Sequence, residues 1–186
     1  MRRIVVLALT AAVAACGSLQ PFVPDTARMP AGGLGGGLDP DVTASNLAQW
    51  AFSDSGRTYG RPIEAARAAA SLDYLAGEIY TSPRWSNISP LTKEQLLQGR
   101  QELRAALGVA PGATSQQVVD SLTAAGNALA AGNQPGAVQA LTTSVFPAGP
   151  DRTLAILSNL PYLRTANIAT QRLGNSLFDN TGEERF

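Results

Sequence analysis

The sequence of 186 residues contains no histidine and only one cysteine, Cys16. Without histidine the chain cannot build Ser-His-Asp or Cys-His nucleophile systems, and it lacks the side chain that most often binds metals. With one cysteine it cannot form an internal disulfide, so its stability must come from a packed core. We therefore expect no metal ion and no cofactor, and the commonest catalytic centres are excluded.

Charged residues make up only 15% of the chain and aromatic residues 6%, and the formal net charge is zero. Nucleic-acid binding requires a clustered basic excess, so we expect no nucleic-acid partner. Much of the hydrophobic content is alanine, and no stretch alternates between apolar and polar residues as a strand would. Alanine favours helices over sheets, which predicts an all-α protein.

The first sixteen residues have the pattern of a secretory signal. Arg2 and Arg3 precede an apolar run over residues 4–15, which only Thr10 interrupts, and the run ends at Cys16. As a helix this run would be roughly 18 Å long, too short to cross a hydrocarbon core of about 30 Å. A basic start, a short apolar run and a small-residue exit are typical of a segment that is cleaved from the mature protein.

The stretch from Val13 to Cys16 (V-A-A-C) resembles the signal of bacterial lipoproteins, over residues 1–16 only. The resemblance implies removal of residues 1–15, a diacylglyceryl group on the Cys16 thiol and an acyl group on the new amine. Since Gly17 is not the aspartate linked to inner-membrane retention, it also implies an outer-membrane anchor with the domain in the periplasm. Two acyl chains already suffice for stable anchoring. An ordinary cleaved signal and an uncleaved apolar N-terminus are the alternatives.

Residues 16–39 differ in composition from the chain on either side. Pro21, Pro24 and Pro30 punctuate them, and residues 32–37 are nearly pure glycine. Prolines remove hydrogen-bond donors and glycines raise the entropy cost of ordering, so we predict a flexible tether. A loose coil of about 23 residues has a root-mean-square reach of roughly 26 Å.

Apolar residues recur at three- and four-residue spacing from about residue 40 to 174. This predicts a compact bundle or array of about five to seven short helices, followed by a loose polar tail over residues 175–186. Thr114 and Gln117 form a capping-box pattern, and Gly108 suits a left-handed helix end. Proline, capping and glycine signals place the expected helices at about 40–53, 62–80, 90–107, 115–131, 135–144, 151–160 and 162–173.

Residues 126–141 resemble the middle of a tetratricopeptide unit, in which small residues let two antiparallel helices pack closely. Such units repeat about every 34 residues, and stacking needs about three of them. No second copy occurs at that offset. An ordinary helical hairpin is therefore the favoured interpretation.

Carboxylates are the groups that remain for catalysis, and periplasmic peptidoglycan would supply a polysaccharide to cleave. Glu78 is the best single candidate, because apolar neighbours together with Tyr74 and Tyr80 would raise its pKa toward that of an acid catalyst. The favoured interpretation is a solvated helix face, with Glu64 and Arg67 as an ordinary surface pair, so no catalytic residue is assigned. The candidates on expected helices are Glu64, Asp73, Glu78, Glu94 and Glu102.

The loop over residues 80–88 is the best candidate for binding a partner. Arg84 and Trp85 are of the types that concentrate binding energy at interfaces, Pro83 stiffens the loop, and Tyr80 opens it. The alternative is that Trp85 fills the top of the core while Arg84 is solvated. We expect a non-enzymatic binding or structural protein of the envelope, whose partner is another protein, peptidoglycan or a second copy. A carboxylate-dependent peptidoglycan-cleaving enzyme and a carrier of apolar ligands are the alternatives.

Overall fold

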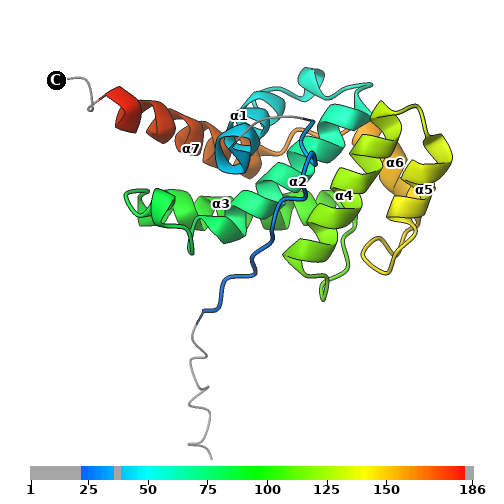
Figure 1. Ribbon diagram of the computed structural model, residues 1–186, viewed down its shortest axis with the longest axis horizontal. Coiled ribbons are helices and arrows are strands. Elements are labelled where there is room, and N and C mark those ends of the chain that lie inside the picture. Colours follow the sequence, from blue (N-terminus) through cyan, green and yellow to red (C-terminus); the bar gives the residue numbers. More distant parts are fainter. Residues whose placement is uncertain (1–21, 36–38, 183–186) are drawn as a thin grey trace, which may run out of the picture.

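A computed structural model describes residues 22–35 and 39–182, with side chains up to residue 177. The described chain is all-helical, as predicted, and forms seven α-helices without a strand (Figure 1). The predicted signal peptide, the lipidation site at Cys16 and residues 36–38 lie outside the described residues. The helices are α1 (Pro40–Phe52), α2 (Pro62–Glu78), α3 (Pro90–Leu107), α4 (Ser115–Ala130), α5 (Gln134–Leu141), α6 (Pro150–Ser158) and α7 (Arg164–Gly182), with short 3-10 turns η1 (Ser55–Arg57) and η2 (Pro83–Trp85).

Most helix ends follow from local sequence signals. The Asp39 side chain accepts hydrogen bonds at the start of α1, and Thr114 and Gln117 form the predicted capping box of α4. Gly108 ends α3 at a φ of 67°. Three predicted starts differ by one or two residues: α5 begins at Gln134 instead of Pro135, α6 at Pro150 instead of Asp151, and α7 at Arg164 instead of Tyr162.

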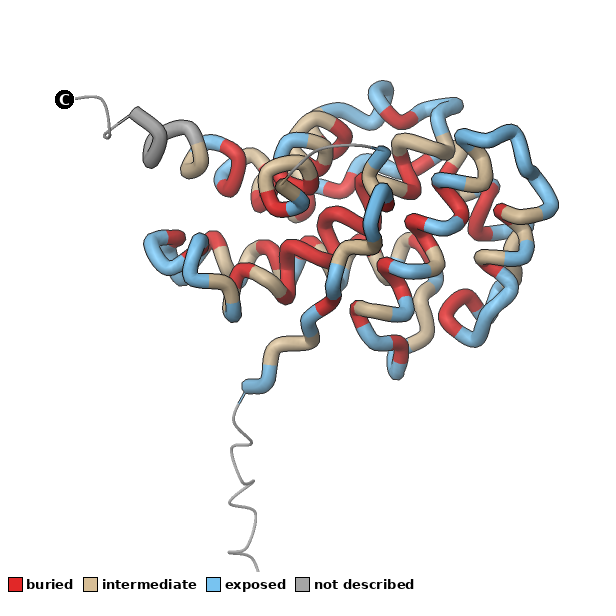
Figure 2. The backbone as a smooth tube through the Cα atoms, in the orientation of Figure 1, coloured by how far each residue is buried: buried red, intermediate tan, exposed pale blue. Residues whose placement is uncertain are grey.

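Helix α2 is the centre of the fold. It contacts α1, α3, α4 and α6, and Figure 2 shows it buried along most of its length. Sequence spacing predicts a single apolar stripe, but residues 68–77 are buried without interruption. Small side chains make this possible, because neighbouring helices can approach an alanine-rich helix from several sides. The buried alanines of α2 are Ala65, Ala66, Ala68, Ala69, Ala70 and Ala76.

Helices α5 and α7 pack on the neighbours of α2 instead of on α2 itself. Helix α7 packs on α3 and α1, and α4 packs on α5 as the predicted helical hairpin. A Cβ atom on Gly99 of α3 would lie 3.0 Å from the Cα of Ala166, so this glycine allows α3 and α7 to approach closely. None of the helices in the described ranges is long and apolar enough to cross a bilayer.

The predicted loose tail is wrong for residues 175–182, which continue α7. Gly174 suggests a helix end, but it is buried within the helix, where the Gln49 side chain of α1 occupies the space that a Cβ would take. The Gln49 amide donates to Asn175 at 3.3 Å, and Leu177 packs against the core. These contacts with α1 and the core extend the helix beyond its local signal.

The predicted flexible tether is wrong for residues 22–35, which we call the docked segment. This segment lies along α2 and α4 (Figure 1), and Ala27 within it is only 5% exposed. Its backbone passes close to Gly77 of α2 and bonds to the Gln116 side chain of α4, as described below. The glycine and proline content of the segment did not indicate this docking, because the residues that hold the segment come from distant parts of the chain.

Candidate functional site

The loop predicted to bind a partner contributes Trp85 and Ile88 to the core, while several of its other residues remain exposed. Trp85 in η2 is fully buried, and its indole N–H finds no acceptor among the described residues. The interpretation of Trp85 as a binding residue is therefore wrong, and its alternative role as the plug of the helical core is confirmed. Aromatic side chains bury large apolar areas, so the burial of Trp85 stabilises the junction at which η2 joins α2 to α3.

Arg84 joins the loop to the start of α1 and is not simply solvated. Its guanidinium forms ion pairs with Asp39 and, through Nε at 3.2 Å, with Asp41. The Arg84 side chain is still 42% exposed, so this interaction is a partly solvated clamp. Both carboxylates also lie at the N-terminus of α1, where negative charge is favourable.

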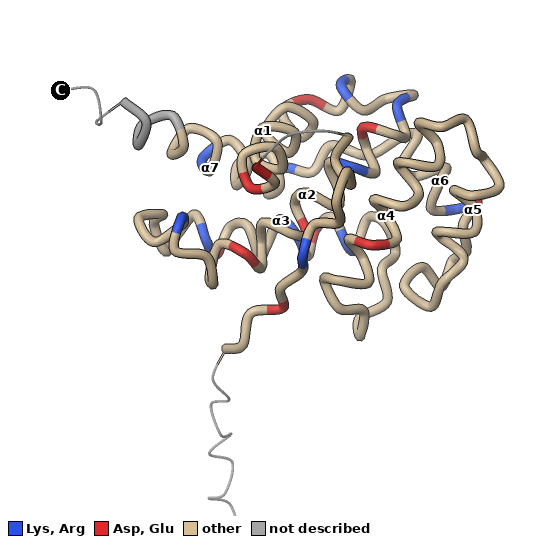
Figure 3. The backbone as a smooth tube through the Cα atoms, viewed as in Figure 1, with Lys and Arg blue, Asp and Glu red and all other residues tan. Residues whose placement is uncertain are grey.

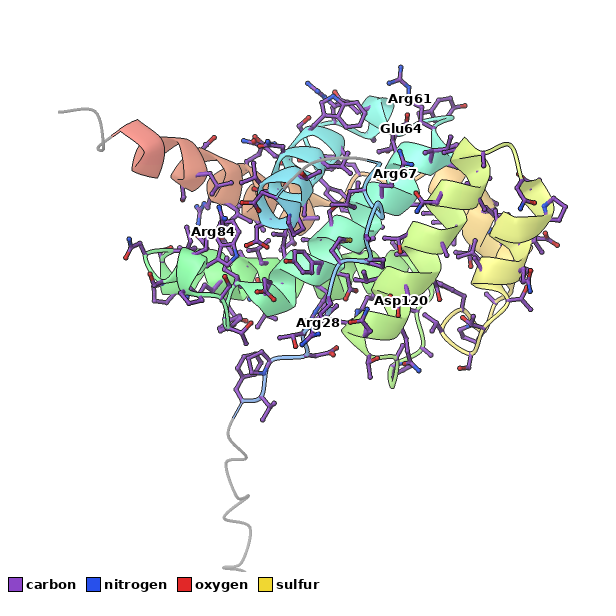
Figure 4. All side chains as sticks on the ribbon, in the orientation of Figure 1. Arg28, Arg61, Glu64, Arg67, Arg84 and Asp120 are labelled. Atoms are coloured by element: carbon purple, nitrogen blue, oxygen red, sulfur yellow. The ribbon has the colours of Figure 1, made fainter. Side chains whose placement is uncertain are left out.

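Tyr74 and Glu78 lie beside the same carboxylates. The Tyr74 hydroxyl donates to Oδ1 of Asp41 at 2.5 Å. Burial, this hydrogen bond and the charge of Asp41 raise the pKa of Tyr74 far above its usual value. Burial and the same carboxylate raise the pKa of Glu78, in the direction predicted for an acid catalyst. Figure 4 places Arg84 in this region and Glu64 far along α2 from it.

The other predicted carboxylates do not gather around Glu78. Glu102 accepts hydrogen bonds from the backbone of Thr165 and Ala166 at 2.8 and 3.0 Å, and so caps α7. Glu94 accepts from Gln98 on the surface of α3. Within the described ranges, no group of three or more acidic or cysteine side chains is arranged to hold a metal ion.

The expected surface pair of Glu64 and Arg67 is not among the ion pairs of the described chain. Arg67 instead donates to the side-chain oxygen of Asn127 on α4 at 3.2 Å. Figure 3 shows acidic and basic residues dispersed over the helices in this view.

The most elaborate polar site is a buried network that sequence reasoning missed. Asp73 of α2 is completely buried and accepts from Nε and Nη2 of Arg104 on α3 at 2.6 and 2.7 Å. Ser115 of α4 donates to Asp73 at 2.7 Å and accepts from Arg100 and Arg104. Asp25 of the docked segment completes the network. Two carboxylates and two guanidiniums thus balance each other in a site where an unpaired charge would be costly.

Asp25 links the docked segment to both α3 and α4. Its carboxylate accepts from the backbone N–H of Ser115 at 3.0 Å, which places negative charge at the N-terminus of α4. It also lies 3.4 Å from Arg104, and its carbonyl oxygen accepts from Arg100 at 3.0 Å. Burial lowers the pKa of Arg100, whereas for Arg104 the hydrogen bonds and charge of Asp73 outweigh burial and raise the pKa.

The rest of the docked segment follows α4 for about three turns. The backbone N–H and C=O of Arg28 both bond to the Gln116 side chain, at 2.7 and 3.0 Å, and Figure 4 shows Arg28 close to Asp120 of α4. Further along, Gly33 packs against Thr123. The segment also crosses α2 at Gly77, where a Cβ would lie 2.3 Å from the Asp25 carbonyl oxygen. Only glycine allows this crossing.

The first described residues leave the helices and are exposed. Phe22 and Val23 are 59% and 79% exposed. The Phe22 ring meets Tyr80 edge-on at 5.1 Å between centroids, and the Lys93 ammonium lies 5.8 Å from the centre of the Tyr80 ring. We call Phe22, Val23, Tyr80 and Lys93 the aromatic patch. Of the three predicted binding residues, Arg84, Trp85 and Tyr80, only Tyr80 lies beside this exposed apolar surface.

A hollow of about 450 Å³ lies near the C-terminal end of α3, against α6. Its rim includes the exposed polar residues Arg152 and Asn159, and it opens at the surface. Buried side chains from the helices fill the interior between them. A carrier of apolar ligands requires an enclosed apolar cavity. This hollow is open and has polar residues at its rim.

Comparison with known protein families, with curated proteins and with solved structures finds no match for this chain. The aromatic patch, the carboxylates around Glu78 and the buried network are therefore interpreted from their chemistry alone.

Proposed function

We propose that this protein is an outer-membrane lipoprotein, anchored through Cys16, whose periplasmic helical domain is a non-enzymatic binding or structural component of the envelope. The V-A-A-C stretch supports the anchor. The observation that carries the proposal is the docked segment, which begins six residues after Cys16 and is tied to α3 and α4 by Asp25. Such a segment would connect a lipid anchor at Cys16 directly to the folded domain.

The non-enzymatic role is supported by what the carboxylates do. Asp73 pairs with Arg104, and Glu102 caps α7. Asp41 accepts from Tyr74 and pairs with Arg84. Each of these carboxylates holds helices together, so we infer that the domain works by contact with a partner. Another envelope protein, peptidoglycan and a second copy of the chain are the candidates for that partner.

Replacement of Cys16 by serine tests the anchor. We expect the wild-type protein to incorporate labelled palmitate and to fractionate with the outer membrane, and Cys16→Ser to lose both properties. Ser86→Ala, an exposed substitution in the domain, is the control and should behave as wild type. Fractionation of Cys16→Ser with the outer membrane would contradict the proposal. For the wild-type protein, crosslinking in intact cells followed by mass spectrometry would identify the partner.

Peptidoglycan cleavage is a second candidate function, and the raised pKa of Glu78 is the observation that favours it. A turnover assay on purified peptidoglycan separates the two functions. We expect no turnover by the wild-type protein. Turnover that Glu78→Gln abolishes would replace the binding role with an enzymatic one.

A further inference from the structure

We propose that the aromatic patch lies against the lipid headgroups of the membrane that holds the acyl chains of Cys16. This inference rests on the proposed anchor and adds an orientation to it. It commits to the protein's own membrane as the occupant of an exposed surface at the start of the docked segment. Three observations support it: the length of chain before the patch, the rigidity of the chain after it, and the chemistry of its residues.

The chain between the anchor and the patch is short. Phe22 follows Cys16 by six residues, which span at most about 20 Å when fully extended. A domain of this size is roughly 40 Å across. A link shorter than the domain prevents it from turning its far side toward the membrane. The side that carries Phe22 must therefore remain close to the lipid.

The chain after the patch is fixed to the helices, so the link does not lengthen beyond Phe22. Asp25 bonds to the backbone of Ser115, and the backbone of Arg28 bonds to Gln116. Ala27, between these two attachments, is buried. A flexible tether extending to residue 39 would have left the orientation free, whereas the docked segment removes that freedom.

The residues of the patch suit the boundary between lipid and water. Phe22 and Val23 offer apolar side chains that the fold leaves exposed. Tyr80 has an apolar ring with a polar end, a combination that is enriched at headgroup level. Lys93 lies over this ring and can extend its ammonium to headgroup phosphates. The exposed Tyr59 provides a contrast, because it lies two residues from Arg61, which Figure 4 shows at the far end of the molecule from the first described residues.

The test uses the full lipidated protein in vesicles of phosphatidylethanolamine and phosphatidylglycerol. Because acylation occupies the only native thiol, an introduced cysteine takes up a fluorescent label selectively. Val23→Cys and Tyr59→Cys, each carrying the fluorophore NBD, form a matched pair of exposed sites. We expect a headgroup-located spin-labelled lipid to quench the label at position 23 several-fold more strongly than the label at position 59.

The outcomes separate the orientation from the anchor. Equal quenching at both positions, in protein that floats with the vesicles, would overturn the orientation and leave the anchor intact. Protection of position 23 from aqueous iodide without quenching by lipid would also overturn it, since a second copy would then cover the patch. Protein that carries a free Cys16 thiol and does not float would overturn both the anchor and the orientation.

Discussion

Asp73 is the residue on which the centre of the fold depends most. It is a buried charge that the Arg104 guanidinium neutralises and to which the Ser115 hydroxyl donates a hydrogen bond. Removal of one partner from a buried ion pair leaves the other charge uncompensated and costs about 3–5 kcal/mol. We therefore expect Asp73→Asn to lower the free energy of unfolding by this amount in urea denaturation. Asp120→Asn, an exposed carboxylate on α4, is the control, and an equally small loss for both variants would contradict the assignment.

Trp85 tests whether the loop before α3 is core or binding surface. Since its side chain is fully buried, we expect Trp85→Ala to cost about 3–5 kcal/mol of stability in denaturant unfolding. Trp50 on α1 is partly exposed, and Trp50→Ala should cost distinctly less. A Trp85→Ala protein that unfolds at the wild-type denaturant concentration would restore the binding interpretation.

Glu78 gives stability a dependence on pH. Its pKa in the folded protein is raised above the ordinary value of 4.5, so the folded state holds this proton at a pH where the unfolded state has lost it. Stability from this group is therefore fully present below pH 4.5 and declines as the pH rises through the higher folded pKa. We expect Glu78→Gln to melt at a higher temperature than wild type at neutral pH. The difference should disappear below pH 4.5, and a difference independent of pH would be inconsistent with the raised pKa.

At the scale of elements, Gly77 decides whether the docked segment fits over α2. A Cβ at this position would collide with the Asp25 carbonyl oxygen, so we expect Gly77→Ala to displace the segment. Trypsin cleavage after Arg28, whose backbone is bonded to Gln116, should then be several-fold faster. Gly112→Ala is the control, because a Cβ there meets open space. Equal cleavage rates in the two variants would mean that the close crossing at Gly77 does not hold the segment.

The helices were predictable from sequence because their ends depend on local chemistry. Asp39, Thr114 and Gly108 act within a few residues of their own positions, and the structure uses each of them as expected. The C-terminal end of α7 was not predictable in this way. Gly174 accommodates a side chain from α1, and a contact of that kind leaves no local signal.

The docked segment and the buried network could not be derived from local patterns. Asp25 meets Ser115 across 90 residues, and composition alone assigns the segment to a flexible class. Two signals were present in the sequence. Asp73 interrupts an apolar stretch of α2, and Arg100 and Arg104 recur at i, i+4 on the same helix as the apolar Leu103. Charges at core positions require partners, although the sequence does not identify them.

For the whole molecule, the docked segment changes the picture of the anchor. The expected tether of roughly 26 Å root-mean-square reach would separate the domain from the lipid. With residues 22–35 attached to α2 and α4, only the short stretch before Phe22 remains as a link. Under the proposed anchor, the domain would be held close to the membrane in a defined orientation, and its partner would be one that reaches that surface.

The intact mass of the mature protein, purified from envelopes, tests the anchor most directly. We predict a chain that begins at Cys16 and carries a diacylglyceryl group on sulfur and an acyl group on its amine. Fragmentation should place all of the added mass on Cys16. A mature chain with an unmodified thiol at Cys16, or one that retains residues 1–15, would contradict the anchor and the membrane orientation that depends on it.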